Sequence, residues 1–161
     1  MIDIIQGVIL PAAYSLLPPR YNSPEATAQL LAIGLQESKF LERRQRPSGP
    51  ARGFWQFEAP TTRLVLEHPK VGPVLGECLF ALRYRPPFTT EDLMAIINHN
   101  DLAAACAARC LLWSDRHALP RQGETDLAWL MYLSAWRPGT PRRDTWDANY
   151  AAAWERVALI S

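Results

Sequence analysis

The chain has 161 residues, which suits one domain (1–161) that buries about two thirds of its unfolded surface without cross-links. Its formal net charge of +1 at pH 7 gives no overall attraction to a polyanion, so no nucleic-acid partner is expected. No apolar run reaches the roughly twenty residues of a membrane span, which argues against stable membrane insertion.

The first segment, Met1 to Leu17, is apolar but lacks the features of a signal peptide. It carries Asp3 in place of basic residues, is interrupted by Pro11, and has no clear small-residue cleavage site. We therefore interpret it as a helix that docks on the core. A protein made in the cytoplasm without a signal peptide is expected.

The segment from Ser23 to Leu41 is predicted to be a core-facing helix that continues to about Arg43. Asn22 or Ser23 can cap it, and Pro24 suits its first turn. Apolar side chains recur on one face at the three-and-four spacing of a buried helix: Ala26, Leu30, Ile33, Gly34, and Phe40 or Leu41.

Glu37 lies on this same apolar face. Removing an ionised carboxylate from water costs on the order of several kcal/mol, so such a group either pairs with a cation or keeps its proton. A carboxyl that keeps its proton near neutral pH is a usable general acid. Two other interpretations stay open: a position on the helix surface, or a salt bridge to a nearby arginine.

A loop follows from residue 43 to residue 53, and the chain returns through the run Gly53-Phe54-Trp55-Gln56-Phe57. Only these few residues have strand character, so at most a small β-hairpin is expected near the cleft. We expect the returning run to form a cleft wall. Trp55 is expected to face the cleft, because it lies on a glycine-flanked turn and not on a periodic face.

The rest of the chain shows helical periodicity, with prolines between the periodic segments. Helices are predicted at residues 61–67, 74–82, 91–98, 102–113, 124–136 and 144–159. Trp146, Tyr150 and Trp154 recur at helical spacing and are assigned to the core. The sequence therefore predicts an all-α domain.

The three cysteines, Cys78, Cys106 and Cys110, do not form a disulfide framework or a metal-ligand pattern. They are odd in number, and no paired CxxC or second histidine accompanies His99, so we expect small apolar core residues and neither a metal nor a cofactor. A Gly-rich phosphate loop and a Gly-x-Ser-x-Gly elbow are also missing, which argues against nucleotide and triad chemistry.

The order of these motifs resembles the lytic transglycosylases and goose-type lysozymes of the lysozyme-like superfamily. The resemblance spans about residues 24–154, and four stretches carry it: Glu37-Ser38-Lys39-Phe40, Gly49-Pro50-Ala51-Arg52-Gly53-Phe54-Trp55-Gln56-Phe57, residues 107–113, and Tyr132-Leu133-Ser134-Ala135-Trp136-Arg137-Pro138-Gly139. It implies a compact lysozyme-like helical domain. It also implies that Glu37 is the catalytic acid and that the substrate is the glycan strand of peptidoglycan.

The expected substrate contacts lie around these motifs: Ser38, Phe54, Trp55, Gln56, Tyr132 and Trp136. Four arginines of the loop before the turn are candidates for contacts with the carboxylates of the peptide stems, although a solvated loop is the commoner arrangement. They are Arg43, Arg44, Arg46 and Arg52.

Two motifs depart from the family pattern. The usual Gly-Leu-Met-Gln turn is here Gly53-Phe54-Trp55-Gln56, which enlarges both middle residues. Trp136 and Arg137 replace the Tyr and Asn of the family's Ala-Tyr-Asn-x-Gly motif, so the hydroxyl expected beside the acid is missing there. Tyr132, one turn earlier on the same helical face, can substitute for it.

The reaction type depends on a second carboxylate. The resemblance implies that a lytic transglycosylase needs one Glu, because the sugar's own 6-hydroxyl closes an anhydro ring. An inverting hydrolase requires another carboxylate about 6.5–9.5 Å away to activate water. Glu58 is the nearest candidate, with Asp115 and Asp101 behind it, although a solvated place in the next helix's first turn is simpler. We therefore expect a transglycosylase.

We expect cleavage between N-acetylmuramic acid and N-acetylglucosamine, with Glu37 as general acid and base. The compact chain without a signal peptide is similar to phage-encoded muralytic proteins, so other phage particle or lysis proteins are candidate partners. Wall access then needs a holin, virion delivery or cell lysis. Two alternatives stay open: an inactive lysozyme-like module that binds glycan or builds a virion, suggested by Trp136 and Arg137, and a less supported helical nucleic-acid or regulatory protein.

Overall fold

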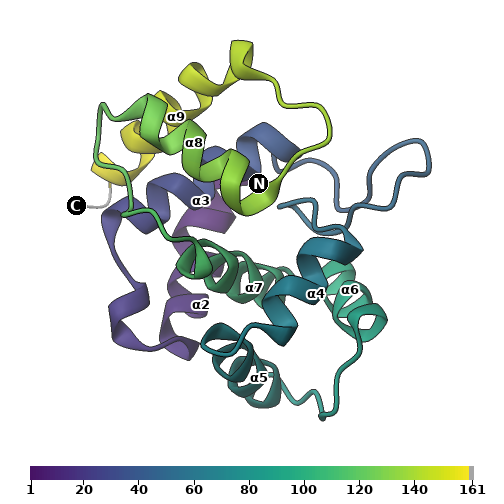
Figure 1. Cartoon of the computed structure of the whole chain (residues 1–161). Coiled ribbons are helices and arrows are strands. Elements are labelled where there is room, and N and C mark those ends of the chain that lie inside the picture. The colour runs from purple at the N-terminus through teal and green to yellow at the C-terminus, as the bar shows by residue number, and fades with distance from the viewer. Residues whose placement is uncertain (160–161) are drawn as a thin grey trace.

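Helices dominate the chain in a computed structural model, which describes residues 1–159 (Figure 1). This confirms the predicted all-α class, and apart from the end of α3 the longer helices agree with the predicted segments to within a few residues. In chain order the elements are α1 (Ile2–Ile4), a π-helical turn (Ile5–Ile9), α2 (Leu10–Leu16), a 3-10 turn (Pro19–Tyr21), α3 (Pro24–Glu37), α4 (Ala59–Glu67), α5 (Val71–Ala81), α6 (Thr90–His99), α7 (Asp101–Ser114), α8 (Thr125–Trp136) and α9 (Arg143–Ala158).

The core is built around α7, which crosses the middle of the molecule (Figure 1). Every residue from Ala103 to Leu112 is buried, and most of them are alanine or cysteine. A helix covered on all sides belongs in a core, and its small side chains let α2, α5 and α6 pack closely against it. The three cysteines are free, buried thiols in this packing.

The first residues form a helix that docks on the core, as expected. Ile5, Leu10 and Ala13 are buried, and the π-helical turn ends two residues before Pro11. The side chain of Gln6 donates to the carbonyl oxygen of Arg156 at 2.6 Å, which joins the start of the chain to α9.

Helix α3 begins as the sequence predicts but ends earlier. The hydroxyl of Ser23 caps its start by accepting a hydrogen bond from the amide of Ala26 at 3.1 Å. The expected end near Arg43 is wrong, because Lys39 and Phe40 have φ of 52° and 55°, which no right-handed helix accommodates.

A glycine explains how the chain turns so soon after α3. Phe40 folds back so that its ring packs against Gly34, where a Cβ would lie 2.1 Å from a ring carbon. The absence of a side chain at Gly34 therefore makes room for the turn. Glu37 becomes the last residue of α3, and it no longer lies in mid-helix as the sequence predicted.

The expected hairpin is reduced to two isolated bridges, Arg44 with Arg52 and Arg52 with Phe57. Arg52 and Phe57 exchange two backbone hydrogen bonds of 2.8 Å, which close the turn of residues 53–56. Within residues 1–159, no helix combines the length and the apolar character that crossing a membrane requires.

Candidate active site

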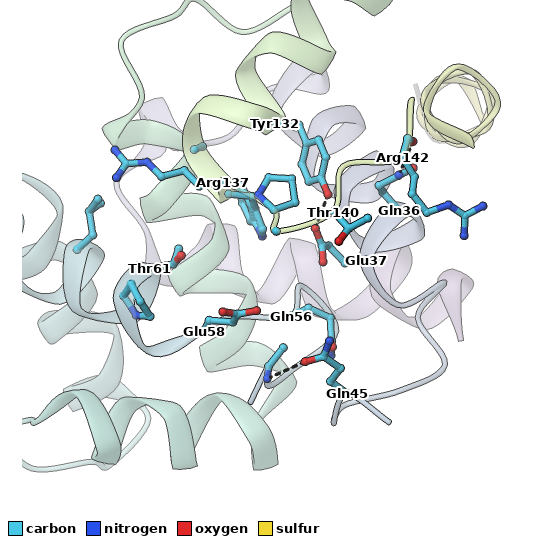
Figure 2. A pocket seen from close by; sticks show the side chains of 17 residues that line it. Gln36, Glu37, Gln45, Gln56, Glu58, Thr61, Tyr132, Arg137, Thr140 and Arg142 are labelled. Atoms are coloured by element: carbon cyan, nitrogen blue, oxygen red, sulfur yellow. Dashed lines mark hydrogen bonds between the residues drawn. The ribbon is translucent and has the colours of Figure 1, made fainter. Parts of the chain in front are cut away.

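A cavity of about 510 Å³ opens beside the C-terminal end of α3 (Figure 2). Its walls come from segments that are distant in sequence: the end of α3, the turn and the start of α4, the end of α8, and the loop of residues 137–142. Glutamines, glutamates, threonines and arginines line much of it. The cavity therefore suits a polar ligand better than an apolar one.

Glu37 lies half-buried in the wall of this cavity. Burial raises the pKa of Glu37 to about 7 from an ordinary value of 4.5. The hydrogen bond from Tyr132 opposes the rise because it favours the carboxylate, whereas the negative charge of Glu58 adds to it. A substantial fraction of the Glu37 carboxyl groups is thus protonated at neutral pH.

An arginine does not neutralise Glu37. None of the ion pairs in the described part of the chain includes this carboxyl group. The salt bridge that the sequence left open is therefore not formed. Without a cationic partner, the carboxyl group of Glu37 is neutral only when it holds a proton.

Tyr132 supplies the hydroxyl that the last motif lacks. Its phenol donates a hydrogen bond of 2.6 Å to Oε1 of Glu37. The ring stacks on Trp146 with centroids 5.0 Å apart, which fixes its direction. Burial, together with the neighbouring Glu37, raises the pKa of Tyr132 above its ordinary value, so the phenol stays a donor at neutral pH. The geometric substitution expected from the sequence is confirmed.

Gln56 lines the cavity at the tip of the turn. Its backbone has φ of 50°, and its side-chain amide donates to the carbonyl oxygen of Gly53 at 2.8 Å. A positive φ at a residue with a side chain costs on the order of 1 kcal/mol and persists only where surrounding contacts enforce it. The turn is therefore a fixed part of the cavity wall.

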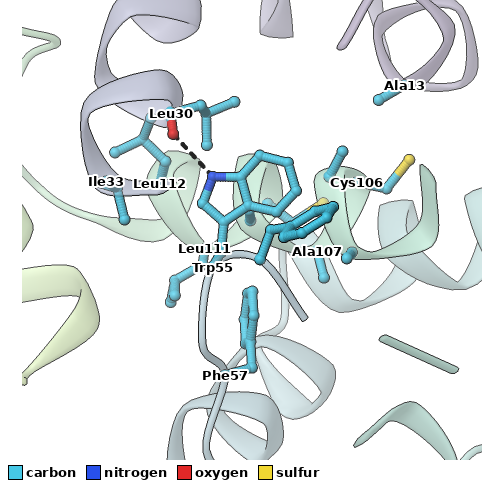
Figure 3. Close-up of a cluster of buried hydrophobic side chains, with 14 of the residues drawn as sticks. Ala13, Leu30, Ile33, Trp55, Phe57, Cys106, Ala107, Leu111 and Leu112 are labelled. Atoms are coloured by element: carbon cyan, nitrogen blue, oxygen red, sulfur yellow. Dashed lines mark hydrogen bonds between the residues drawn. The ribbon is translucent and has the colours of Figure 1, made fainter. Parts of the chain in front are cut away.

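Trp55 and Phe54 do not face the cavity, so these two expectations are wrong. Both side chains are completely buried. The indole of Trp55 donates to the carbonyl oxygen of Leu30 at 2.9 Å and packs among core residues of α3 and α7 (Figure 3). The closed turn places its large apolar side chains in the core, where their burial gains more free energy than a solvent-facing position.

Ser38 and Trp136 also differ from expectation. The hydroxyl of Ser38 donates to the carbonyl oxygen of Phe54 at 2.6 Å and so joins the end of α3 to the turn. Ser38 does not line the cavity. Trp136 does line the cavity, but it is buried and its indole donates to the carbonyl oxygen of Trp55 at 2.9 Å. With 5 % of its surface exposed, Trp136 has little free ring face on which a sugar could stack.

Glu58 lies in the same cavity as Glu37, and Figure 2 shows its carboxylate directed into the space. It is exposed and precedes the first residue of α4, without a side-chain capping bond. The other two candidate carboxylates are engaged elsewhere: Asp101 pairs with Arg43, and Asp115 with His117. Of the three, Glu58 alone lines the cavity.

The four loop arginines, candidates for contacts with peptide-stem carboxylates, have partners within the protein and lie outside the cavity lining. Arg43 makes two hydrogen bonds of 2.7 and 2.8 Å to Asp101, and Arg46 pairs with Glu42 at 3.1 Å. Arg44 donates to Asn98, and Arg52 donates to the carbonyl oxygen of Gly49. None of the four lines the cavity.

Sequence reasoning missed two parts of the cavity: Gln36, and the second half of the loop, where Thr140 and Arg142 line it. Gln36 donates to the carbonyl oxygen of Arg142 at 2.8 Å, and this bond ties the loop to α3 directly beside Glu37. A contact between residues 106 positions apart leaves no local pattern to detect.

Comparison of the chain with protein-family models, curated proteins and solved structures finds no match. In the described residues, no group of three or more His, Cys, Asp or Glu side chains is arranged to hold a metal ion. The site combines a proton donor with a pKa near 7, a phenol that orients it and a second carboxylate in one open polar cavity.

Proposed function

We propose that the protein cleaves the glycan strand of peptidoglycan between N-acetylmuramic acid and N-acetylglucosamine, with Glu37 as general acid. One observation carries the proposal: Glu37, with its pKa raised to about 7, borders an open polar cavity of about 510 Å³. Glycoside cleavage requires a protonated carboxyl beside the leaving oxygen. The motif order that resembles lysozyme-like enzymes agrees with this assignment.

In the first step the Glu37 carboxyl gives its proton to the glycosidic oxygen as the bond from that oxygen to the sugar's anomeric carbon breaks. The bonding electrons stay with the oxygen, and the sugar acquires positive charge. Tyr132 holds Oε1 of Glu37, which leaves Oε2 to carry the proton toward the cavity.

In the second step the Glu37 carboxylate takes a proton back as a base. If the attacking group is the sugar's own 6-hydroxyl, an anhydro ring closes and the enzyme is a lytic transglycosylase. If it is water, the enzyme is a muramidase, and Glu58 is placed in the same cavity to activate the water. Glu37 alone suffices for the transglycosylase, which we favour. As a muralytic protein of phage type, it would reach the wall after holin release, virion delivery or lysis.

The test is to incubate the purified protein with peptidoglycan and to analyse the soluble products by mass spectrometry. The wild type should release anhydro-muropeptides, and Glu37→Gln, which keeps the shape but loses the acid, should release at least about a thousandfold less. Glu67→Gln is the matched control, because Glu67 is exposed on α4 outside the cavity lining. Hydrated products that depend on Glu37 would identify a muramidase.

The second candidate is an inactive module that binds the glycan. The buried Trp136 favours it, because this residue stands where the resemblance implies a catalytic-site tyrosine and its indole is engaged with the backbone of Trp55. This candidate predicts that wall fragments bind to the wild type and that neither anhydro nor hydrated products appear.

A further inference from the structure

Two arginines mark the ends of the loop that forms one wall of the cavity. Arg137 and Arg142 are both exposed and both line the cavity. Figure 2 shows their guanidinium groups on opposite sides of the cavity, each directed outward from it. A chain lying in the cavity would therefore pass a cation on either side of Glu37.

These two guanidinium groups have weak partners in the protein. Arg137 donates from Nε to the carbonyl oxygen of Ser134 at 3.4 Å, and Arg142 pairs with the exposed Asp144 at 3.3 Å. By contrast, Arg43 binds Asp101 through two short bonds. An exposed ion pair of such length contributes little free energy, so an incoming acidic group can compete for these arginines.

The backbone under each arginine is nevertheless fixed. Arg137 ends α8 in the left-handed conformation, with φ of 50°, and its amide donates to the carbonyl oxygen of Leu133. The carbonyl oxygen of Arg142 accepts from Gln36 at 2.8 Å and from Thr145 at 3.2 Å. The base of each side chain is therefore held at a defined place, whereas its guanidinium group, with only weak partners, is available to an acidic ligand.

Charge in the cavity also favours an acidic ligand. When Glu37 holds its proton, the charged lining residues are Glu58, Arg137 and Arg142, which leaves one net positive charge. Arginine presents a planar fork of donors that matches a carboxylate, so these residues recognise acids better than neutral hydroxyl groups.

We propose that Arg137 and Arg142 bind carboxylates carried by the side chains of the N-acetylmuramic acid units, and that they make the protein select acid-bearing glycans over neutral ones such as chitin. The inference rests on the proposed function and names the substrate class of that same site. N-acetylmuramic acid occupies every second place in the strand, so a strand that lies in the cavity carries acid groups past its arginine-bearing wall.

The test uses calorimetric titration of the Glu37→Gln protein, so that binding is measured without cleavage. The ligands are a tetrasaccharide of alternating N-acetylglucosamine and N-acetylmuramic acid with peptide stems, the same tetrasaccharide without stems, and chitotetraose. Adding Arg137→Gln or Arg142→Gln should raise the Kd for the stem-bearing ligand about fivefold, and the double change about tenfold or more. The Kd for chitotetraose should not change.

Arg83→Gln is the matched control. Arg83 is also an exposed arginine with a positive φ, 71°; it lies two residues after the end of α5 and does not line the cavity. It should leave all three Kd values unchanged. The stem-free ligand identifies the source of the acid: a Kd that still depends on the arginines indicates the lactyl carboxylate, and one that does not indicates the peptide.

Two results would overturn the inference. The first contradicts the inference alone, and the second also contradicts the proposed function. Equal binding of the stem-bearing tetrasaccharide and chitotetraose, unaffected by the arginine changes, would remove this inference and leave the proposed function standing. A failure of Glu37→Gln to bind any of the three ligands would remove the proposed function together with the inference. Circular dichroism of each variant checks that it is folded.

Discussion

At the residue scale, the proton on Glu37 is retained because burial outweighs the hydrogen bond from Tyr132. A general acid acts only while protonated, so kcat/KM for glycan cleavage should fall about tenfold per pH unit above its pKa of about 7. The pH–rate profile of the wild type measures this falling limb, the part of the profile in which kcat/KM decreases as pH rises.

Glu58→Gln provides the control for this prediction. Removing the negative charge of Glu58 takes away one cause of the raised pKa of Glu37, so the falling limb should move to lower pH. A limb near pH 4 to 5 in the wild type would show that Glu37 is not the titrating acid, because 4.5 is its ordinary pKa.

Tyr132 affects both the direction and the acidity of Glu37. Tyr132→Phe removes the donor that lies 2.6 Å from Oε1. Because that bond favours the carboxylate, its loss should raise the pKa of Glu37 further and move the falling limb to higher pH. The carboxyl also loses its orientation, so kcat should fall about tenfold.

A second tyrosine tests whether this effect belongs to the site. Tyr14 is also hydrogen-bonded, with its phenol 2.9 Å from the hydroxyl of Thr27, and it lies outside the cavity lining. Tyr14→Phe should leave the limb where the wild type has it. If the two variants shift the profile equally, the shift reports general loosening of the fold and not the Tyr132 contact.

At the element scale, the end of α3 depends on the space above Gly34. In an isolated helix, Gly→Ala gains about 0.5–1 kcal/mol of stability. At Gly34 the new Cβ would lie 2.1 Å from the ring of Phe40, so Gly34→Ala should instead lower the free energy of unfolding by about 1–3 kcal/mol. It should also reduce cleavage, because Phe40 shapes the turn after Glu37. Urea denaturation measures the first effect.

Gly76 of α5 offers the matched control. A Cβ there meets nothing within 4 Å. Gly76→Ala should therefore show the ordinary gain of about 0.5–1 kcal/mol, without a change in cleavage. Loss of stability in both variants would mean that the packing of Phe40 on Gly34 does not explain the short α3.

How far the sequence predicts the molecule also depends on the element. Helices such as α6 and α7 were predicted almost to the residue, because their caps and apolar spacing are local properties. Glu37 was singled out for the same reason, because its place on an apolar helical face is also a local property. The end of α3 was missed because it depends on a ring that folds back from Phe40, and helix periodicity contains no information about that contact.

The turn of residues 53–56 shows the same limit within the site. Its position beside the acid follows from the order of motifs, and Gln56 lines the cavity as expected. The direction of Trp55 could not be predicted, because Phe54 and Trp55 are neighbours that both turn into the core, and only the tertiary packing decides which side chains of a closed turn are buried. Arg142 was missed because its place in the cavity wall depends on a hydrogen bond from the distant Gln36.

At the scale of the whole molecule, the cavity and the core are different regions. The core surrounds α7, whereas the cavity lies where α3, the turn before α4 and the α8–α9 loop meet. Free energy gained by burying the apolar core therefore compensates for the half-buried carboxyl of Glu37, which is unfavourable whenever it is ionised.

Because the ionised form of Glu37 is unfavourable in the fold, the free energy of unfolding should depend on pH. The pKa is 4.5 for the ordinary carboxyl, as in the unfolded chain, and about 7 in the fold. Below pH 4.5 Glu37 is protonated in both the folded and the unfolded state, so its ionisation does not reduce the free energy of unfolding. As pH rises from 4.5 to 7, the unfolded state releases its proton first, so the free energy of unfolding decreases, and above 7 the loss is complete.

Glu37→Gln removes this titration and should be more stable than the wild type above pH 7 by on the order of 1–3 kcal/mol, with the partial exposure of Glu37 reducing the gain. At pH 4 the two proteins should be nearly equal, and Glu67→Gln should differ from the wild type by a constant amount. Urea unfolding at pH 4, 6 and 8 makes the comparison. A pH-independent difference would contradict the raised pKa. A variant that gains stability as it loses cleavage also shows that Glu37 is kept for its chemistry and not for the fold.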